Sequence, residues 1–233
     1  NEHSIDALVI IGGDGTMRGA LDLHRAGVPV IGVPGTIEND VYGTELALGV
    51  DTALNTALEA MDRIRDTASA QRQVFLIELM GESSGYLTLM AGIAGGAEHV
   101  VIPEVETDPE HIADVLTTAY EKGKSHAIVV VAEGAQYNAE TLSQYFIKHK
   151  ERLGFDLRVT ILGHVQRGGN PNAVDRILAS RLGVAAVEQM KKGKYGVLVG
   201  EVKGDVVATP LSKVVETKKE LDKNLIRLAE MLD

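Results

Sequence analysis

The sequence predicts an α/β protein built on parallel β-sheet. Short apolar runs rich in Val, Ile and Leu recur along its 233 residues and are bounded by turn residues, as buried parallel strands are. Stretches with helical periodicity alternate with these runs, which is the pattern of βαβ units. Glycine-rich loops follow the first two runs. About seven strands are expected, enough for one parallel sheet or for two.

The first elements form one βαβ unit. We expect a strand at residues 7–11, a helix at residues 17–26 that ends at Gly27, and a second strand at residues 28–33. Apolar residues then recur at helical spacing over residues 47–69, which predicts one long amphipathic helix.

The rest of the chain continues the alternation. The remaining strands are expected at residues 74–79, 100–102, 127–132, 157–162 and 197–202, and the remaining helices at residues 86–93, 109–122, 139–152, 173–192 and 219–232. A turn-rich loop, GHVQRGGNP at residues 163–171, precedes one of these helices. No Pro/Gly/Ser-rich linker marks a domain boundary, so two domains would have to be joined through ordered elements.

Composition excludes several classes of protein. The 45% hydrophobic content is typical of a globular protein, and no apolar run reaches the roughly 18 residues of a membrane span. The net charge of −10 argues against general nucleic-acid binding. Because the chain has no cysteine, disulfides, thiolate metal sites and cysteine nucleophiles are excluded. We therefore expect a cytoplasmic protein that binds neither membrane nor nucleic acid.

Two loops carry the candidate chemistry: GGDGT at residues 12–16 and VPGTIENDVYG at residues 33–43. Each follows one of the first two strands, and loops at the C-terminal ends of neighbouring parallel strands face the same crevice. Acidic groups beside glycine-rich backbone suit a metal ion and phosphates better than they suit a core. The side chains expected to converge there are those of Asp14, Thr36, Glu38 and Asp40.

The GGDGT loop alone has two interpretations. Its glycines let backbone N–H groups approach phosphate oxygens, and Asp14 could hold Mg²⁺ against those oxygens. Alternatively, the loop is a tight turn in which Asp14 caps a helix. The loop is not a Walker A motif, because no Lys-Ser/Thr follows it. On the first interpretation, the phosphate-binding residues are Gly12, Gly13, Gly15 and Thr16.

A family resemblance follows from these motifs. GGDGT resembles a signature shared by phosphofructokinases, NAD kinases and diacylglycerol or sphingosine kinases, and it cannot choose among them. PGTIEND at residues 34–40 resembles the PGTIDND loop of 6-phosphofructokinases. Further matches to that family are Met80-Gly81, AEGA at residues 132–135 and GHVQRGGNPNAVDRILASRLG at residues 163–183. Together the matches span nearly the whole chain.

The resemblance implies a fold and a reaction. The fold is that of two Rossmann-like parallel-sheet subdomains. Nucleotide and Mg²⁺ would bind residues 1–49 with about 166–215, and sugar phosphate would bind residues about 50–165 with 216–233. The reaction is transfer of the γ-phosphoryl of ATP to the 1-hydroxyl of fructose 6-phosphate, which gives fructose 1,6-bisphosphate. Such transfer needs positioning and charge neutralisation more than covalent chemistry.

The resemblance also assigns roles in the two loops. Asp14 would coordinate Mg²⁺, Thr36 would hold the transferring phosphoryl group, and Asp40 would bind the sugar and orient its hydroxyl. Glu38 stands where the family has its catalytic aspartate, which accepts the hydroxyl proton. Glutamate reaches about one methylene further, and a misplacement of about 1 Å can cost roughly 100-fold in rate. Alternatively, Glu38 only caps a turn in a non-catalytic paralogue.

Sugar-binding residues are also implied. Met80, Gly81 and Glu133 would line the sugar, although a carboxylate such as Glu133 could instead cap a helix. A basic cluster would bind the 6-phosphate, or its arginines could be surface ion-pair partners. In the family the first residue of this cluster reaches a neighbouring subunit's site, so a homo-oligomer, usually a tetramer, is implied. The cluster consists of Arg158, His164 and Arg167.

Some residues depart from the family pattern. Gln73 falls where the family has a second phosphate-binding arginine, and Arg72 beside it would face the other side of a strand. Glu82 replaces the arginine of the family's MGR motif. Gly15 and Gly35 leave room for a nucleotide where pyrophosphate-dependent relatives carry an aspartate and a lysine, which favours ATP as the donor.

Three further expectations complete the interpretation. About 90 residues of the family, with a first strand and a Gly-rich loop, precede the point where this chain begins, so we expect a fragment that is inactive or nearly so by itself.

The alternative function is a catalytically weak or regulatory sugar-phosphate-binding paralogue; pyrophosphate-dependent phosphofructokinase and NAD kinase are more remote. Residues near positions of the family's nucleotide effector site could make the enzyme allosteric, or could be ordinary surface residues. They are Arg65, Gly96, Glu98, Lys122, Lys124 and His126.

Overall fold

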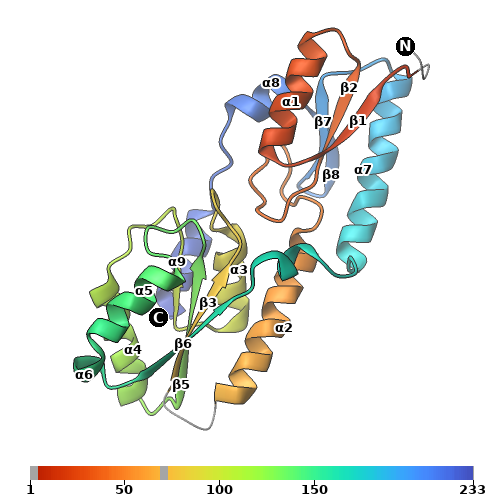
Figure 1. Cartoon of the computed structure of the whole chain (residues 1–233). Coiled ribbons are helices and arrows are strands. Elements are labelled where there is room, and N and C mark those ends of the chain that lie inside the picture. Colours follow the sequence, from red (N-terminus) through yellow and green to blue (C-terminus); the bar gives the residue numbers. More distant parts are fainter. Residues whose placement is uncertain (1–4, 69–72, 233) are drawn as a thin grey trace. The chain divides into compact units, whose positions relative to one another are not determined.

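The computed structural model describes residues 5–68 and 73–232, and the chain divides into two units (Figure 1). Unit 1 comprises Asn1–Thr52 and Asn170–Glu220, and unit 2 comprises Ala53–Gly169 and Leu221–Asp233. Each unit has its own β-sheet and its own hydrophobic core. The prediction of an α/β fold with parallel sheets is therefore confirmed. No helix in the described part of the chain is long and apolar enough to cross a membrane.

The sheet of unit 1 has the order β1-β2-β7-β8. Its strands are β1 (Leu8–Gly12), β2 (Val30–Pro34), β7 (Val197–Val202) and β8 (Asp205–Pro210). β1 pairs with β2 and β2 pairs with β7 in parallel, whereas β8 is antiparallel to β7. The sequence did not predict β8. Its two-residue hairpin turn, Lys203-Gly204, has positive φ at both positions but lacks the usual Asn-Gly signal.

Helices cover both faces of this sheet (Figure 1). Helices α1 (Asp14–Arg25) and α8 (Leu211–Glu216) pack on one face, and α7 (Ala173–Lys191) packs on the other. Strand β2 is buried at every position, as expected for a central parallel strand. The short helix α8 is a second element that the sequence did not predict.

The sheet of unit 2 is entirely parallel and has the order β4-β5-β3-β6. Helices α4 and α5 pack on one face and α2 and α3 on the other, while α9 packs against α3 and β4. The strands are β3 (Gln73–Leu79), β4 (His99–Val101), β5 (His126–Ala132) and β6 (Asp156–Ile161). The helices are α2 (Val50–Ala68), α3 (Tyr86–Gly95), α4 (Pro109–Glu121), α5 (Ala139–Lys148), α6 (Lys150–Leu153) and α9 (Lys223–Leu232).

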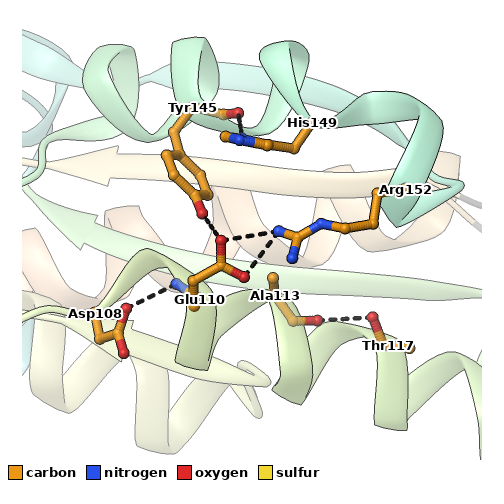
Figure 2. A network of polar contacts seen from close by, with 7 residues as sticks. All are labelled: Asp108, Glu110, Ala113, Thr117, Tyr145, His149 and Arg152. Carbon is orange, nitrogen blue, oxygen red and sulfur yellow. Dashed lines mark hydrogen bonds and ion pairs between the residues drawn. The ribbon is translucent and has the colours of Figure 1, made fainter.

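The expected single helix at residues 139–152 is wrong, because the chain breaks at His149 into α5 and α6. Figure 2 shows why the break is stable. Arg152 donates to both carboxylate oxygens of Glu110 on α4, at 2.9 and 2.8 Å, and Tyr145 on α5 donates to the same carboxylate. Ring atom Nδ1 of His149 lies 2.8 Å from the Tyr145 carbonyl. Helix α6 is thereby held against α4 instead of continuing α5.

Two other expected boundaries also change. The closing helix begins at Lys223 rather than at residue 219, so Lys219 lies in the segment between α8 and α9. The turn-rich loop at residues 163–171 contains a short 3₁₀ helix, η1 (Gly163–Arg167), directly after β6.

Candidate functional site

The two loops that follow β1 and β2 lie directly against each other in unit 1. Gly12 pairs with Pro34 in the parallel ladder, and the Gly35 N–H donates to the Gly12 carbonyl at 2.9 Å. A Cβ atom on Gly35 would come within 2.8 Å of the Ile11 side chain, so glycine permits this close approach. Gly35 is therefore needed for the packing of the second loop against β1.

Asp14 lies in the first turn of α1, where the N-cap residue is Gly13. The interpretation of Asp14 as the cap is therefore wrong. Its carboxylate accepts from Arg18 one turn later, at 2.9 Å from Nη2 and 3.0 Å from Nε, and its side chain is 34% exposed. Gly15 and Thr16 are exposed, and a Cβ atom on Gly15 would meet no described atom within 4 Å. The N-terminus of α1 thus presents open backbone that favours anions.

In the second loop, Thr36 lies beside both candidate residues. Its Oγ1 accepts a hydrogen bond from the Glu38 N–H at 3.2 Å, and its side chain acts to lower the pKa of Asp40. A Cβ atom on Gly13 would lie 3.3 Å from the Thr36 Cβ, so Thr36 packs against the first loop. The structure therefore brings Thr36, Glu38 and Asp40 together beside GGDGT.

Burial dominates the electrostatics of this loop. Burial raises the pKa of Asp40 above its usual value, and the Asp14 carboxylate acts in the same direction. A backbone hydrogen bond, Lys219 and the Thr36 hydroxyl act against this shift. Burial also lowers the pKa of Lys219 to about 8, while Asp40 and Glu45 oppose that change. The charges of Asp40 and Lys219 therefore favour each other, but for both groups burial has the larger effect.

The residues of this loop region fit a magnesium ion that arrives with phosphates. Among the described residues, no group of three or more His, Cys, Asp or Glu side chains could hold a metal ion by itself. Mg²⁺ is usually held by one or two carboxylates together with substrate phosphates and water. Asp14 supplies one carboxylate, and Asp40 Oδ1 is buried with no hydrogen-bond partner among the described atoms. Such a set suits a nucleotide-bound cation better than a protein-only metal site.

In unit 2, the loop after β3 is held by two side chains. The Met80 N–H donates to Gln166 Oε1 at 2.8 Å, and the Gly81 N–H donates to Glu133 Oε1 at 3.1 Å. Gly81 has φ of +152°, which favours glycine. Glu133 is not a helix cap, because α5 is capped by Asn138. Met80, Gly81 and Glu133 are therefore brought together, as expected for residues that line one site.

The basic cluster is only partly assembled. His164 and Arg167 are exposed on η1, which Gln166 connects to the Met80 loop. Arg158 is exposed on the edge strand β6, and no hydrogen bond between described residues joins it to that loop. Arg167 forms no ion pair with any residue in the described ranges, so its interpretation as a surface ion-pair partner has no support there.

Three residues important to these loops were not singled out from the sequence. Asn39 and Gln166 are 3% and 1% exposed; Asn39 bonds to the backbone just after its own loop, and Gln166 accepts from the backbone of the loop after β3. Both lie inside the motifs that resemble the family, and this place was the available signal. No sequence pattern points to Lys219, because its contact with the Glu45 carbonyl joins residues that lie far apart in the sequence.

The departing and effector-related residues are placed as follows. Gln73 is the first residue of β3, Arg72 lies outside the described residues, and Glu82 is exposed. Lys124 forms an ion pair with Glu98 at 3.0 Å. Arg65 bonds to the carbonyl of Gly95, next to Gly96.

Comparisons with known proteins agree on one family. The sequence profile described as phosphofructokinase matches residues 1–190. The chain is 53% identical over 229 residues to ATP-dependent 6-phosphofructokinase 1 of Thermus thermophilus, with 98% of this chain and 70% of that protein covered. It is 47% identical to the ATP-dependent 6-phosphofructokinase of Natranaerobius thermophilus, covering 99% of this chain and 71% of that protein.

A solved structure shows the same likeness. The phosphofructokinase of Pichia pastoris in the T-state matches with a TM-score of 0.84 and 30% sequence identity, covering 99% of this chain and 28% of that longer chain.

Proposed function

The chain belongs to the phosphofructokinase family, and from this premise we propose that it transfers the γ-phosphoryl group of ATP to the 1-hydroxyl of fructose 6-phosphate. It is thus an ATP-dependent 6-phosphofructokinase of glycolysis. The observation that carries the proposal is the close packing of the two loops: the Gly35 N–H donates to the Gly12 carbonyl at 2.9 Å, and Thr36, which accepts from the Glu38 N–H, packs against Gly13. Phosphoryl transfer needs this kind of preorganised positioning.

Unit 1 supplies the nucleotide site. Backbone N–H groups of Gly12, Gly13, Gly15 and Thr16, together with the N-terminus of α1, bind the phosphates of ATP. Asp14 would hold Mg²⁺, which would neutralise phosphate charge. Its carboxylate also accepts from Arg18 at 2.9 Å, and this guanidinium is well placed to bind a phosphate oxygen.

The second loop acts on the acceptor. Glu38 is the general base that takes the proton of the sugar hydroxyl, and Asp40 orients that hydroxyl. The Glu38 N–H is held by Thr36, which fixes the backbone from which the longer glutamate side chain reaches out. We infer that this pocket is built for glutamate. Shortening the side chain in Glu38→Asp is then expected to lower kcat rather than to raise it.

Unit 2 supplies the sugar-phosphate site. Met80, Gly81 and Glu133 contact the sugar, and its hydroxyls compete for the Glu133 carboxylate that now binds the Gly81 N–H. His164 and Arg167, exposed on η1, bind the 6-phosphate. Arg158, on the edge strand of this unit, serves a neighbouring subunit in a homo-oligomer, for which the family suggests a tetramer.

ATP is the donor that the relatives' names favour, since both are called ATP-dependent. The open space beside Gly15 also suits a nucleotide larger than pyrophosphate. We further propose a cytoplasmic location and nucleotide regulation through the effector-related residues near Lys124 and Glu98.

A donor and acceptor screen tests this function. The protein that carries this chain is incubated with Mg²⁺, with ATP or pyrophosphate as donor, and with fructose 6-phosphate or NAD as acceptor. We expect ADP release only with ATP and fructose 6-phosphate, and loss of that signal when Mg²⁺ is chelated. Asp14→Asn tests the proposed metal ligand. Its matched control is Asp22→Asn, which changes an exposed aspartate later on α1. Turnover with pyrophosphate and not with ATP would contradict the donor, and turnover with NAD would contradict the acceptor.

A further inference from the structure

Asn39, the residue between Glu38 and Asp40, has an uncommon backbone conformation. Its φ is +53°, in the left-handed region that L-residues seldom adopt and that asparagine tolerates better than most. The residue is also 3% exposed, so solvent does not satisfy its amide. A buried polar side chain in this conformation needs hydrogen-bond partners that offset both the backbone strain and the loss of hydration.

Both ends of the Asn39 amide have such partners further along the same loop. Nδ2 donates to the carbonyl of Glu45 at 2.9 Å, and Oδ1 accepts from the N–H of Ala47 at 3.0 Å. We call these two hydrogen bonds the Asn39 clamp. They close the loop that carries the two candidate carboxylates.

The segment that the clamp holds is itself fixed to the sheet. The Glu45 N–H donates to the Glu201 carbonyl on β7 at 2.7 Å, and the Leu48 N–H donates to the Pro34 carbonyl at the end of β2 at 3.0 Å. Ala47 is fully buried. The clamp therefore ties Asn39 to a segment that is hydrogen-bonded to strands β2 and β7 of unit 1.

Lys219 adds a second donor to the same acceptor. Its Nζ lies 3.0 Å from the Glu45 carbonyl, which therefore accepts from both Asn39 and Lys219. The lysine charge also acts on Asp40, as do the Asp14 carboxylate and the Thr36 hydroxyl. Glu45 is the other carboxylate that acts on Lys219. One carbonyl thus joins the clamp to a cation that faces the acceptor-orienting aspartate.

We propose that Asn39 is a positioning residue for phosphoryl transfer, whose clamp on residues 45–47, supported by Lys219, sets the placement of Glu38 and Asp40. The clamp fixes the left-handed residue on which both carboxylates depend, since one precedes it and the other follows it. This inference rests on the function proposed above. A residue that only closed a loop would influence stability without changing the rate of the chemical step at saturating substrate.

Two substitutions separate the clamp from the backbone conformation. Asn39→Gly removes both hydrogen bonds but adopts positive φ freely, whereas Asn39→Ala removes the bonds and also opposes that conformation. The matched control is Lys203→Gly, because Lys203 has the same φ of +53° on an exposed hairpin turn. We expect kcat to fall about 100-fold in both Asn39 variants, with the KM for ATP changed less than about threefold. Lys203→Gly is expected to retain the original kcat.

The outcomes are distinguishable. An Asn39→Gly enzyme with kcat within about threefold of the original would overturn the proposal, because backbone conformation alone would then suffice. If the Asn39 variants do not fold, Lys219→Met decides: a kcat lowered about threefold to tenfold supports the clamp, and an unchanged kcat overturns it.

A readout independent of activity separates this inference from the proposed function. Exchange of the Ala47 amide hydrogen is expected to accelerate at least about tenfold in Asn39→Gly and to stay unchanged in Lys203→Gly. If the exchange rate of the Ala47 amide were unaltered in Asn39→Gly, the clamp would not protect this amide, and the proposal would be wrong even for an active enzyme. The original protein could instead phosphorylate no sugar while the exchange responds as expected. The proposed function would then be wrong, and so would the positioning role of Asn39. The clamp would remain only as a contact that closes the loop.

Discussion

The loop after β2 in unit 1 and the loop after β3 in unit 2 are held in opposite ways. In unit 1, the loop after β2 is closed by its own residues: Asn39 bonds to positions six and eight residues later. In unit 2, the loop after β3 is held by side chains from distant parts of the chain. Gln166 binds the Met80 N–H, and Glu133 binds the Gly81 N–H.

The two buried amides also differ in how fully they are used. Asn39 uses both ends of its amide, whereas Gln166 accepts one hydrogen bond and its Nε2 has no partner among the described residues. A loop closed by local bonds keeps its carboxylates in place before substrate arrives, which suits residues that act on the reacting atoms. A loop whose N–H groups donate to side-chain acceptors can donate to a ligand instead when the ligand replaces those acceptors. The difference predicts that changes in unit 1 alter kcat and that changes in unit 2 alter the KM for the sugar phosphate.

The largest expected effect is that of Glu38→Gln. Loss of the general base should lower kcat about 10²- to 10⁴-fold, with little change in the KM for fructose 6-phosphate. Steady-state kinetics measures both parameters, and Glu188→Gln, an exposed glutamate on α7, is the control. If Glu38→Gln raised KM and left kcat unchanged, the division of roles between the loops would be wrong.

Arg167→Ala should show the opposite pattern. Removal of a guanidinium that binds the 6-phosphate should raise the KM for fructose 6-phosphate about 10- to 100-fold and leave the KM for ATP unchanged. Arg63→Ala removes an arginine that is exposed on α2, where it pairs with Glu59 one turn away, and serves as the control. An equal rise for both substrates would show that Arg167 supports the fold and not the sugar site.

The two buried amides should differ in their contribution to stability. Asn39→Ala breaks two satisfied hydrogen bonds at a left-handed residue and should lower the free energy of unfolding by about 2–4 kcal/mol. Gln166→Leu breaks one and also removes an unpaired donor, so about 1 kcal/mol is expected. Denaturant unfolding measures both, with the exposed Gln144→Leu as control. A larger loss for Gln166→Leu would reverse the comparison.

The last expected effect is a pH dependence of stability due to Lys219, which concerns stability and not turnover. Its pKa of about 8 in the folded protein lies below the ordinary 10.5, so the unfolded chain binds more protons between these values. Stability should therefore rise as pH increases from about 8 to 10.5, by up to about 3 kcal/mol. Lys219→Met should remove this rise, and Lys218→Met, an exposed neighbour, should keep it. A rise of equal size in both variants would assign the effect to another group.

Much of unit 1's candidate site could be predicted because its determinants are local. Strand ends, glycine-rich loops and the carboxylates of PGTIEND lie within short stretches, and the resemblance to the family rests on the same stretches. The parallel α/β fold followed from apolar periodicity, which is also a local property. The hairpin partner β8 was missed because Lys203-Gly204 is an unusual turn sequence.

The supports of the site were harder to predict because they join distant residues. Gln166 meets Met80 across 86 positions, and Lys219 meets Glu45 across 174. The break at His149 likewise depends on Arg152 reaching Glu110 on another helix. Such contacts depend on the order of strands in the sheet, which periodicity does not specify.

The most direct test of the central claim is the position of the transferred phosphate. Phosphorus NMR can follow ATP, Mg²⁺ and fructose 6-phosphate with the protein that carries this chain, with Glu38→Gln as the matched sample. We predict a new phosphomonoester signal coupled to the two C1 protons of the sugar, formed together with ADP and nearly absent with Glu38→Gln. Release of inorganic phosphate without that signal, or a phosphate on any other sugar position, would contradict the assignment of this loop as the site that activates the 1-hydroxyl.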